Sequence, residues 1–249
     1  MKIWHISDTH GIHHKLSIPK NIDIVVHTGD CSNNSNPRKN EFEVRDFITW
    51  FDRLPIKHKV FVPGNHDTSI EYAFVHETDF SNLGIHLLVD KSVVLEGLTI
   101  YGTPWCPQWG AWSYMYPRKT LYENVFKNIP EGIDILLSHT PPMGQLDLTW
   151  HAPPQGGPHI GWENVGCEDL AKRVLEVNPK LHCFGHIHSF KDGNGRTINN
   201  NGVFTPTNWP SVVSNAATNL HGSFGDVWCP GNVIDWNFVQ HSRGEYDRQ

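Results

Sequence analysis

Apolar strands that end in potential metal ligands constrain this chain more than any other feature of its sequence. The apolar run at residues 2–7 is typical of a short strand, and Asp8 and His10 follow it directly. Residues two apart project from the same face of extended backbone. A carboxylate and an imidazole on one face can grip a divalent metal, although Asp-x-His also occurs in ordinary turns.

The same pattern recurs at four later strands. The apolar runs at residues 22–27, 59–62, 133–137 and 181–184 each predict a buried strand. They are followed in turn by Asp30, by Asn65 and His66, by His139, and by His186 and His188. Ligands of open α/β sheets bind at the carboxyl ends of the strands. The recurrence therefore predicts one metal site built from segments that are far apart in the sequence.

The remaining pattern predicts a mixed α/β fold. Apolar residues with 3.6-residue spacing predict a helix over residues 39–54, which Pro55 ends. With its flanking strands this helix forms a βαβ unit, which gives parallel strands. Residues 85–89, 93–95 and 98–101 predict antiparallel strands with a hairpin turn at Glu96-Gly97, so a second or mixed sheet is expected. Further helices are expected at 119–128 and 167–177, and strands at 212–213 and 233–236.

Several segments are expected to be irregular. Residues 102–117 hold five Trp and Tyr residues, which either pack this aromatic loop onto the body or form a wall that stacks a base and shields the site from water. Residues 144–166 are Gly/Pro-rich and are expected to form a lid-like loop without secondary structure. Residues 189–210 read as a connection and 240–249 as a loosely held tail. With no repeat or linker, residues 1–249 are expected to form one domain.

Composition narrows the class of protein. A net charge of −6 without a Lys/Arg-rich run argues against long DNA or RNA as a partner, although metal ions would still allow a small phosphate substrate. Five scattered cysteines without Cys-x-x-Cys spacing indicate neither a zinc ribbon nor a disulfide framework. No stretch approaches the ~20 apolar residues of a membrane helix. Asp8 and His10 interrupt any signal-peptide core, so a cytoplasmic protein is expected.

The ordered set of strand-end motifs resembles the calcineurin-like metallophosphoesterase superfamily. Its elements are Asp-x-His from Asp8, Gly-Asp at residues 29–30, Gly-Asn-His-Asp at 64–67, the lone His139 and Gly-His-x-His at 185–188. Segments at 102–105, 129–142, 165–170 and 184–188 look like the metallophosphoesterase-domain-containing (MPPED) branch, which is associated with small phosphodiesters, including cyclic nucleotides. The resemblance covers nearly the whole chain. It implies a four-layer αββα sandwich of two mixed β-sheets, with the metal site at the C-terminal ends of the strands.

The resemblance also implies two divalent transition-metal ions per chain. Asp8, His10 and His188 would bind one ion, Asn65, His139 and His186 the second, and Asp30 would bridge them. Mixed nitrogen and oxygen ligands favour Mn²⁺, with Fe, Zn²⁺ and Ni²⁺ as alternatives. The ions would generate a hydroxide that attacks phosphorus, and His66 would protonate the leaving alkoxide. Asn65, His66, Trp105 and His159 are the predicted substrate contacts, and the other histidines are expected in the core or on the surface.

One departure from the family concerns His66. Many relatives pair this histidine with an acid three residues after the bridging aspartate, where this chain has Asn33. Asp67 follows His66 directly, but adjacent side chains need not face each other, so the group that orients His66 is left open. The first histidine of Gly-His-x-His, which some MPPED members lack, is present here as His186.

The expected function is hydrolysis of a small phosphodiester, either a cyclic nucleotide or a nucleotide-like compound. A phosphomonoesterase or a nuclease on the same fold is the alternative within enzymes. A non-catalytic binding or scaffold protein is the alternative from another class. Its sequence would be expected to lack some of the metal-ligating residues. The substrate, the native metal and the oligomeric state are left open by the sequence.

Overall fold

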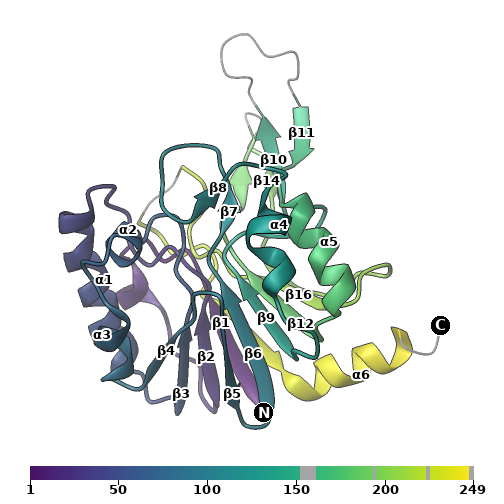
Figure 1. Ribbon diagram of the computed structural model, residues 1–249, viewed down its shortest axis with the longest axis horizontal. Coiled ribbons are helices and arrows are strands. Elements are labelled where there is room, and N and C mark those ends of the chain that lie inside the picture. Colours follow the sequence, from purple (N-terminus) through teal and green to yellow (C-terminus); the bar gives the residue numbers. More distant parts are fainter. Residues whose placement is uncertain (152–160, 193–194, 223–224, 247–249) are drawn as a thin grey trace.

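Two mixed β-sheets face each other at the centre of the molecule (Figure 1). The computed structural model describes residues 1–151, 161–192, 195–222 and 225–246. The first sheet has the order β17 (Asn232–Asp235), β1 (Lys2–Ile6), β2 (Ile24–His27), β3 (His58–Phe61) and β4 (Ile85–Leu87). The second has the order β15 (Gly202–Phe204), β16 (Val212–Asn215), β12 (Leu181–Phe184), β9 (Ile135–Ser138), β6 (Leu98–Thr103) and β5 (Lys91–Leu95).

The interior strands of both sheets run parallel, and the antiparallel strands lie at the edges. In the first sheet β1 to β4 are parallel and β17 is antiparallel to β1. In the second sheet β16, β12, β9 and β6 are parallel, while β15 and β5 pair antiparallel at its two edges. The carboxyl ends of the parallel strands therefore collect at one end of the molecule.

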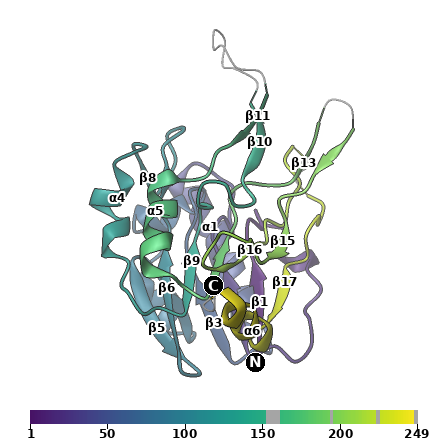
Figure 2. The ribbon, with the colours of Figure 1, turned by 90° about the vertical axis from the view of Figure 1, so that its right-hand side faces the viewer.

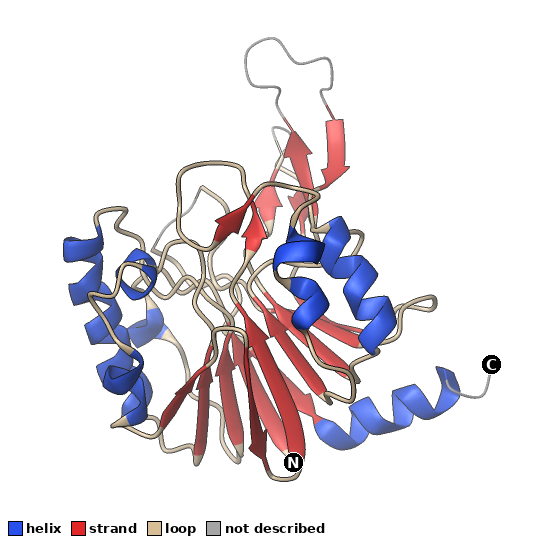
Figure 3. Cartoon of the chain, in the orientation of Figure 1, coloured by secondary structure: helices blue, strands red, loops and turns tan. Residues whose placement is uncertain are grey.

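Helices cover the outer face of each sheet (Figure 3). The first sheet carries η1 (His13–Lys15), α1 (Pro37–Asp52), α2 (Thr68–Glu71) and α3 (Glu77–Ser81). The second carries α4 (Leu121–Asn124), η2 (Phe126–Asn128) and α5 (Glu168–Val177). Figure 2 shows α6 (Trp236–Tyr246) at the end of the sheets that also holds the N-terminus. None of the helices that the structure describes is both long and apolar enough to cross a membrane.

The alternation of side chains along β1 explains the layers. Ile3 lies in the core between the two sheets, whereas Trp4 and Ile6 lie in the core beneath α1. Both faces of this strand are buried, which is why its sequence is almost continuously apolar. A third core lies between the second sheet and α4 and α5. The predicted four-layer αββα sandwich is confirmed.

Helix α1 buries the apolar face that its spacing predicts. Val44, Phe47 and Phe51 are fully buried in the core beneath it, and truncating a phenylalanine in such a core costs about 3–5 kcal/mol. The helix begins at Pro37 rather than at residue 39. The side chain of Asn36 accepts hydrogen bonds from the amides of Arg38 and Lys39, and Pro37 occupies the first turn, where no amide donor is needed.

Three segments that were expected to be irregular contain regular structure. Within 144–166, β10 (Leu148–His151) pairs antiparallel with β11 (Gly161–Asn164), and Trp150 lies opposite Trp162. The connection at 189–210 contains β13 (Phe190–Lys191), β14 (Thr197–Ile198) and the edge strand β15. The expected tail is helical to Tyr246, because α6 inserts Trp236 and Val239 into the core between the sheets. The aromatic loop contains only the short paired segments β7 (Cys106–Pro107) and β8 (Met115–Tyr116).

Candidate metal centre

Five strand ends bring the predicted ligands together. Candidate ligand atoms of Asp8, His10 and His188, which follow β1 and β12, lie within 4.8 Å of one another. Those of Asp30, His139 and His186, which follow β2, β9 and β12, form a second such group. The two groups draw on both sheets, so neither sheet could form them alone.

Asp30 belongs to the second group and also faces the first. Its Oδ2 is 3.4 Å from Nε2 of His139 and 3.9 Å from Nε2 of His10. Asn65 joins the second group, because its Oδ1 lies 2.9 Å from Nε2 of His139. In the first group Nε2 of His188 lies 3.2 Å from Oδ1 of Asp8. One carboxylate is thus within reach of both sets of donors.

Backbone carbonyls fix which ring nitrogen of two histidines faces the centre. Nδ1 of His139 donates to the carbonyl of Thr28 at 2.8 Å, and Nδ1 of His10 donates to that of Ser32 at 3.0 Å. Because a carbonyl can only accept, these contacts assign the proton to Nδ1. The Nε2 atoms, which lie toward Asp30, are then the ones with free lone pairs in the neutral rings. This arrangement is typical of metal-binding histidines.

Charge in the centre is concentrated and buried. Burial acts to raise the pKa of Asp30, but the charges of His139 and His66 and a hydrogen bond from His139 outweigh it, so that its pKa lies well below the usual range. Burial lowers the pKa of His10 to about 4 and that of His186 to about 3. Burial also acts to lower the pKa of His139, but the neighbouring Asp30 carboxylate raises it to about 9. The Asp30 carboxylate thus favours the protonated form of His139.

The backbone is strained at four of these residues. Asp8, His10, Asp30 and His186 have φ angles of 52°, 41°, 59° and 65°. Such left-handed conformations are uncommon outside glycine and concentrate at functional sites. Each one redirects a side chain just where a strand ends, so that the chain turns and the ligand atom faces the centre.

Two glycines allow the loops to approach the carboxylates. A Cβ atom at Gly64 would overlap the side chain and amide of Asp30, and one at Gly185 would overlap the carboxylate of Asp8. The amide of His186 also donates to Asp8 at 3.0 Å. Any larger residue at these positions would displace a carboxylate of the centre.

Asp67 holds two of the loops together and does not orient His66. Its buried carboxylate accepts from the amides of Asp30, Ser32 and Gly64 at 2.9, 3.1 and 2.8 Å. It also accepts from the hydroxyl of Ser32 at 2.7 Å. The carboxylate thus joins the loop after β2 to the loop after β3. Sequence reasoning missed this role, which only the Gly-Asn-His-Asp motif itself could have suggested.

The ring of His66 is held by aromatic contacts. Its centroid lies 4.0 Å from that of Trp112, with an interplanar angle of 35°, and 4.9 Å from that of His10. Within the described chain, its buried Nδ1 has no hydrogen-bond partner. Asn33, which replaces the acid of many relatives, is exposed. Trp112 was not among the predicted substrate contacts.

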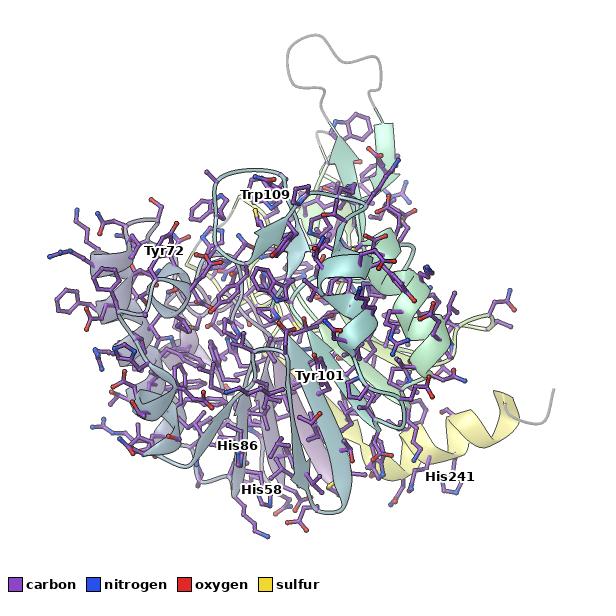
Figure 4. The ribbon with its side chains drawn as sticks, in the orientation of Figure 1. His58, Tyr72, His86, Tyr101, Trp109 and His241 are labelled. Carbon is purple, nitrogen blue, oxygen red and sulfur yellow. The ribbon has the colours of Figure 1, made fainter. Side chains whose placement is uncertain are left out.

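Trp105 anchors the aromatic loop. Its indole N–H donates to Asp90 at 2.6 Å, and its ring packs edge-on against Tyr114 and Tyr116. By contrast, Trp109 is 62% exposed and lies 6.5 Å from His186, ring to ring. Figure 4 shows Trp109 at the end of the molecule opposite His58 and His86. The predicted substrate contact His159 lies outside the described residues.

Comparison with known proteins identifies the family. A sequence model described as calcineurin-like phosphoesterase matches residues 1–190, which is more than half of the chain. The chain belongs to this family. It is a phosphoesterase of a metal-dependent class, and the resemblance to the MPPED branch is confirmed.

Curated relatives support the same assignment. The chain is 30% identical over 238 residues to metallophosphoesterase domain-containing protein 1 of Homo sapiens, an alignment that covers 84% of this chain and 69% of the relative. It is 32% identical over 216 residues to a UPF0046 protein of Caenorhabditis elegans, covering 80% and 69%. One solved crystal structure aligns with a TM-score of 0.56 at 18% identity, covering 86% of this chain and 89% of the other, and supports the fold alone.

Proposed function

We propose that this phosphoesterase is a dinuclear phosphodiesterase that hydrolyses a small, nucleotide-like diester such as a cyclic nucleotide. The observation that carries the proposal is the position of Asp30, whose carboxylate faces His139 of its own group and His10 of the other. A pair of cations needs a shared anionic ligand to lie close together, and the carboxylate of Asp30 meets that need.

The donor atoms fit a pair of divalent transition ions. Asp8, His10 and His188 would hold one, and Asn65, His139 and His186 the other, with Asp30 shared. Mixed imidazole nitrogen, carboxylate oxygen and amide oxygen suit Mn²⁺, Fe or Zn²⁺ better than Mg²⁺ or Ca²⁺, and Mn²⁺ is the ion we favour. The buried negative charges of Asp8 and Asp30 provide the electrostatic drive, since an isolated buried carboxylate is costly.

The chain itself supplies positioning and a proton. Bound ions of this kind polarise the phosphoryl oxygens and lower the pKa of a water molecule. His66 would protonate the leaving alkoxide from Nε2, which lies 4.0 Å from Oδ2 of Asp30 and so faces the centre. The backbone of His66 is fixed by its amide, which donates to Asp30 at 2.7 Å, and by its carbonyl, which accepts from Asn40 at 2.8 Å.

We propose that Trp112 is the residue that orients His66. With Asp67 fully engaged elsewhere and Asn33 exposed, the ring contact at 4.0 Å is the closest aromatic contact of His66 in the described structure. The aromatic loop is tied to the same strand end, because the amide of Ser113 donates to the carbonyl of Asn65 at 3.1 Å. The aromatic contact with Trp112 thus takes the place of the acid that orients this histidine in many relatives.

The exposed ring of Trp109 supports a nucleotide-like substrate. Its ring centroid lies 6.5 Å from that of His186, and a base could stack on its exposed face, since stacking is tolerant of base identity. A small substrate is consistent with the net charge of −6, because long polyanions require a basic face.

The test combines metal content with turnover. Purified wild-type protein should contain at least two transition ions per chain, as a dinuclear centre requires, and should hydrolyse cyclic nucleotides and bis(4-nitrophenyl) phosphate with Mn²⁺. The Asp30→Ala variant should lose turnover, and His241→Ala on the exposed face of α6 should retain it. Metal content near zero in the wild type would favour a scaffold protein. Faster turnover of phosphomonoesters, or strongly salt-dependent cutting of single-stranded oligonucleotides, would contradict the diesterase assignment.

A further inference from the structure

A second cluster of metal-ligating side chains lies outside the dinuclear centre. Candidate ligand atoms of His13, His14 and Asp46 lie within 4.8 Å of one another. His13 and His14 belong to η1, directly after the first strand-end loop, and Asp46 lies on α1. The cluster shares no residue with the two groups described above. We propose that these three residues form an additional transition-metal site that links η1 to α1.

The distances suit a small divalent ion. Oδ2 of Asp46 lies 3.2 Å from Nε2 of His13 and 3.0 Å from Nε2 of His14. Ligand atoms about 2.1 Å from a tetrahedral ion are separated by roughly 3.4 Å, so the donors need little movement to close around one. Two imidazoles and one carboxylate form a set that Zn²⁺ accepts, with water in the fourth position.

His13 points to a ligand because its buried ring lacks hydrogen bonds. The side chain is fully buried, and neither ring nitrogen has a hydrogen-bond partner within the described residues. Nε2 faces Oδ2 of Asp46 at 3.2 Å, an electrostatic contact, and Nδ1 has no polar partner in the described structure. Buried polar atoms without partners are rare and call for an explanation such as an ion.

Packing holds the ring of His13 in place. Its centroid lies 5.4 Å from that of Phe47 and 5.1 Å from that of Trp50, both on α1. Burial, together with the neighbouring His14, lowers the pKa of His13 to about 4. The ring is therefore neutral near pH 7 and keeps the lone pair that a metal requires. The side chains of His14 and Asp46 are 56% and 57% exposed, so the cluster is open to ions from solvent.

The site would reinforce elements next to the dinuclear centre. η1 follows His10 by three residues, and α1 carries Asn40, whose amide donates to the carbonyls of Asn34 and His66. An ion bound to both η1 and α1 would stabilise the native state, because it binds the folded arrangement and not the unfolded chain.

Metal stoichiometry tests the proposal. Untagged protein with its native metals is dialysed against buffered Zn²⁺, and the ions per chain are counted by mass spectrometry. The His14→Ala and Asp46→Ala variants, which change exposed side chains, should each hold one ion per chain fewer than the wild type. His241→Ala, which removes an exposed histidine of α6, is the matched control and should show no loss.

The difference between variants decides the outcome. Equal zinc content in wild type, His14→Ala and Asp46→Ala would overturn the site. In addition, Zn²⁺ should raise the thermal midpoint of the wild type more than that of either variant, and equal shifts would also contradict the proposal. Because the readout is a difference of one ion, it holds whatever the dinuclear centre contains. Turnover of the diester with Mn²⁺, measured on the same samples, reports separately on the proposed function.

Discussion

Replacing Trp112 tests whether an aromatic contact positions His66. The two rings lie 4.0 Å apart, and such a pair contributes about 0.5–1.5 kcal/mol beyond its buried area. Since the backbone of His66 is fixed by hydrogen bonds, loss of this contact should act on the orientation of the ring. About 1.4 kcal/mol corresponds to a tenfold change in rate. We therefore expect Trp112→Ala to lower kcat on a cyclic nucleotide by about tenfold and Trp112→Phe to restore most of it.

The leaving group separates positioning from general damage. Nitrophenolate leaves without protonation, so Trp112→Ala should change kcat on bis(4-nitrophenyl) phosphate little, whereas an alkoxide needs the proton. His66→Ala should show the same selectivity with a loss of about 10²–10⁴-fold on the cyclic nucleotide. In the double variant, loss of Trp112 should add almost nothing, because the two side chains act as one unit. Equal losses on both substrates, or additive losses in the double variant, would refute the reasoning.

Three further predictions concern the framework of the centre. Asp67→Asn should lower the free energy of unfolding by on the order of 3 kcal/mol, because an amide leaves some of the five donors around it unpaired, each at about 1–3 kcal/mol; a urea titration that shows a negligible loss would contradict this. Gly185→Ala should reduce bound metal and turnover together, because the new methyl group overlaps the carboxylate of Asp8; full metal content in the variant would contradict the predicted displacement. Burial lowers the pKa of His182 to about 3, so the unfolded chain takes up its proton at a higher pH than the folded one, and stability should fall as the pH drops from about 6.5 toward 3. Urea unfolding of metal-free protein between pH 4 and 5.5 should therefore show a slope about 1.4 kcal/mol per pH unit shallower in His182→Gln than in the wild type, and identical slopes would count against the cause.

The strand-end residues could be predicted from sequence because two local signals coincide. An apolar run marks a buried strand, and a polar residue directly after it must lie at the rim of the sheet. Asp8, Asp30 and His139 all satisfy both conditions, and the structure brings them together. The βαβ unit was predicted for a similar reason, since the 3.6-residue spacing of the apolar residues in α1 indicates which face of the helix is buried. The assignment of these residues as ligands stays a prediction.

Features that depend on tertiary contacts were not visible in the sequence. The contact between Trp112 and His66 joins segments 46 residues apart, and nothing local distinguishes Trp112 from Trp105, which instead donates to Asp90. The left-handed backbone of Asp30 is stabilised by its surroundings, among them the carboxylate of Asp67. Helix α6 has only a weak apolar pattern, and its burial of Trp236 between the sheets explains why it forms.

The division of the proposed ligands between the two sheets has a consequence for biosynthesis. In chain order, the last proposed ligand from the first sheet is Asn65, whereas the first from the second sheet is His139 and the last is His188. At roughly 5–20 residues per second, a ribosome needs on the order of ten seconds to cross that interval. Throughout that time the nascent chain would carry only the first sheet's share of the proposed ligands. With the proposed ligands, metal loading would therefore be a late event, tied to the docking of the second sheet onto the first rather than to the folding of the N-terminal half.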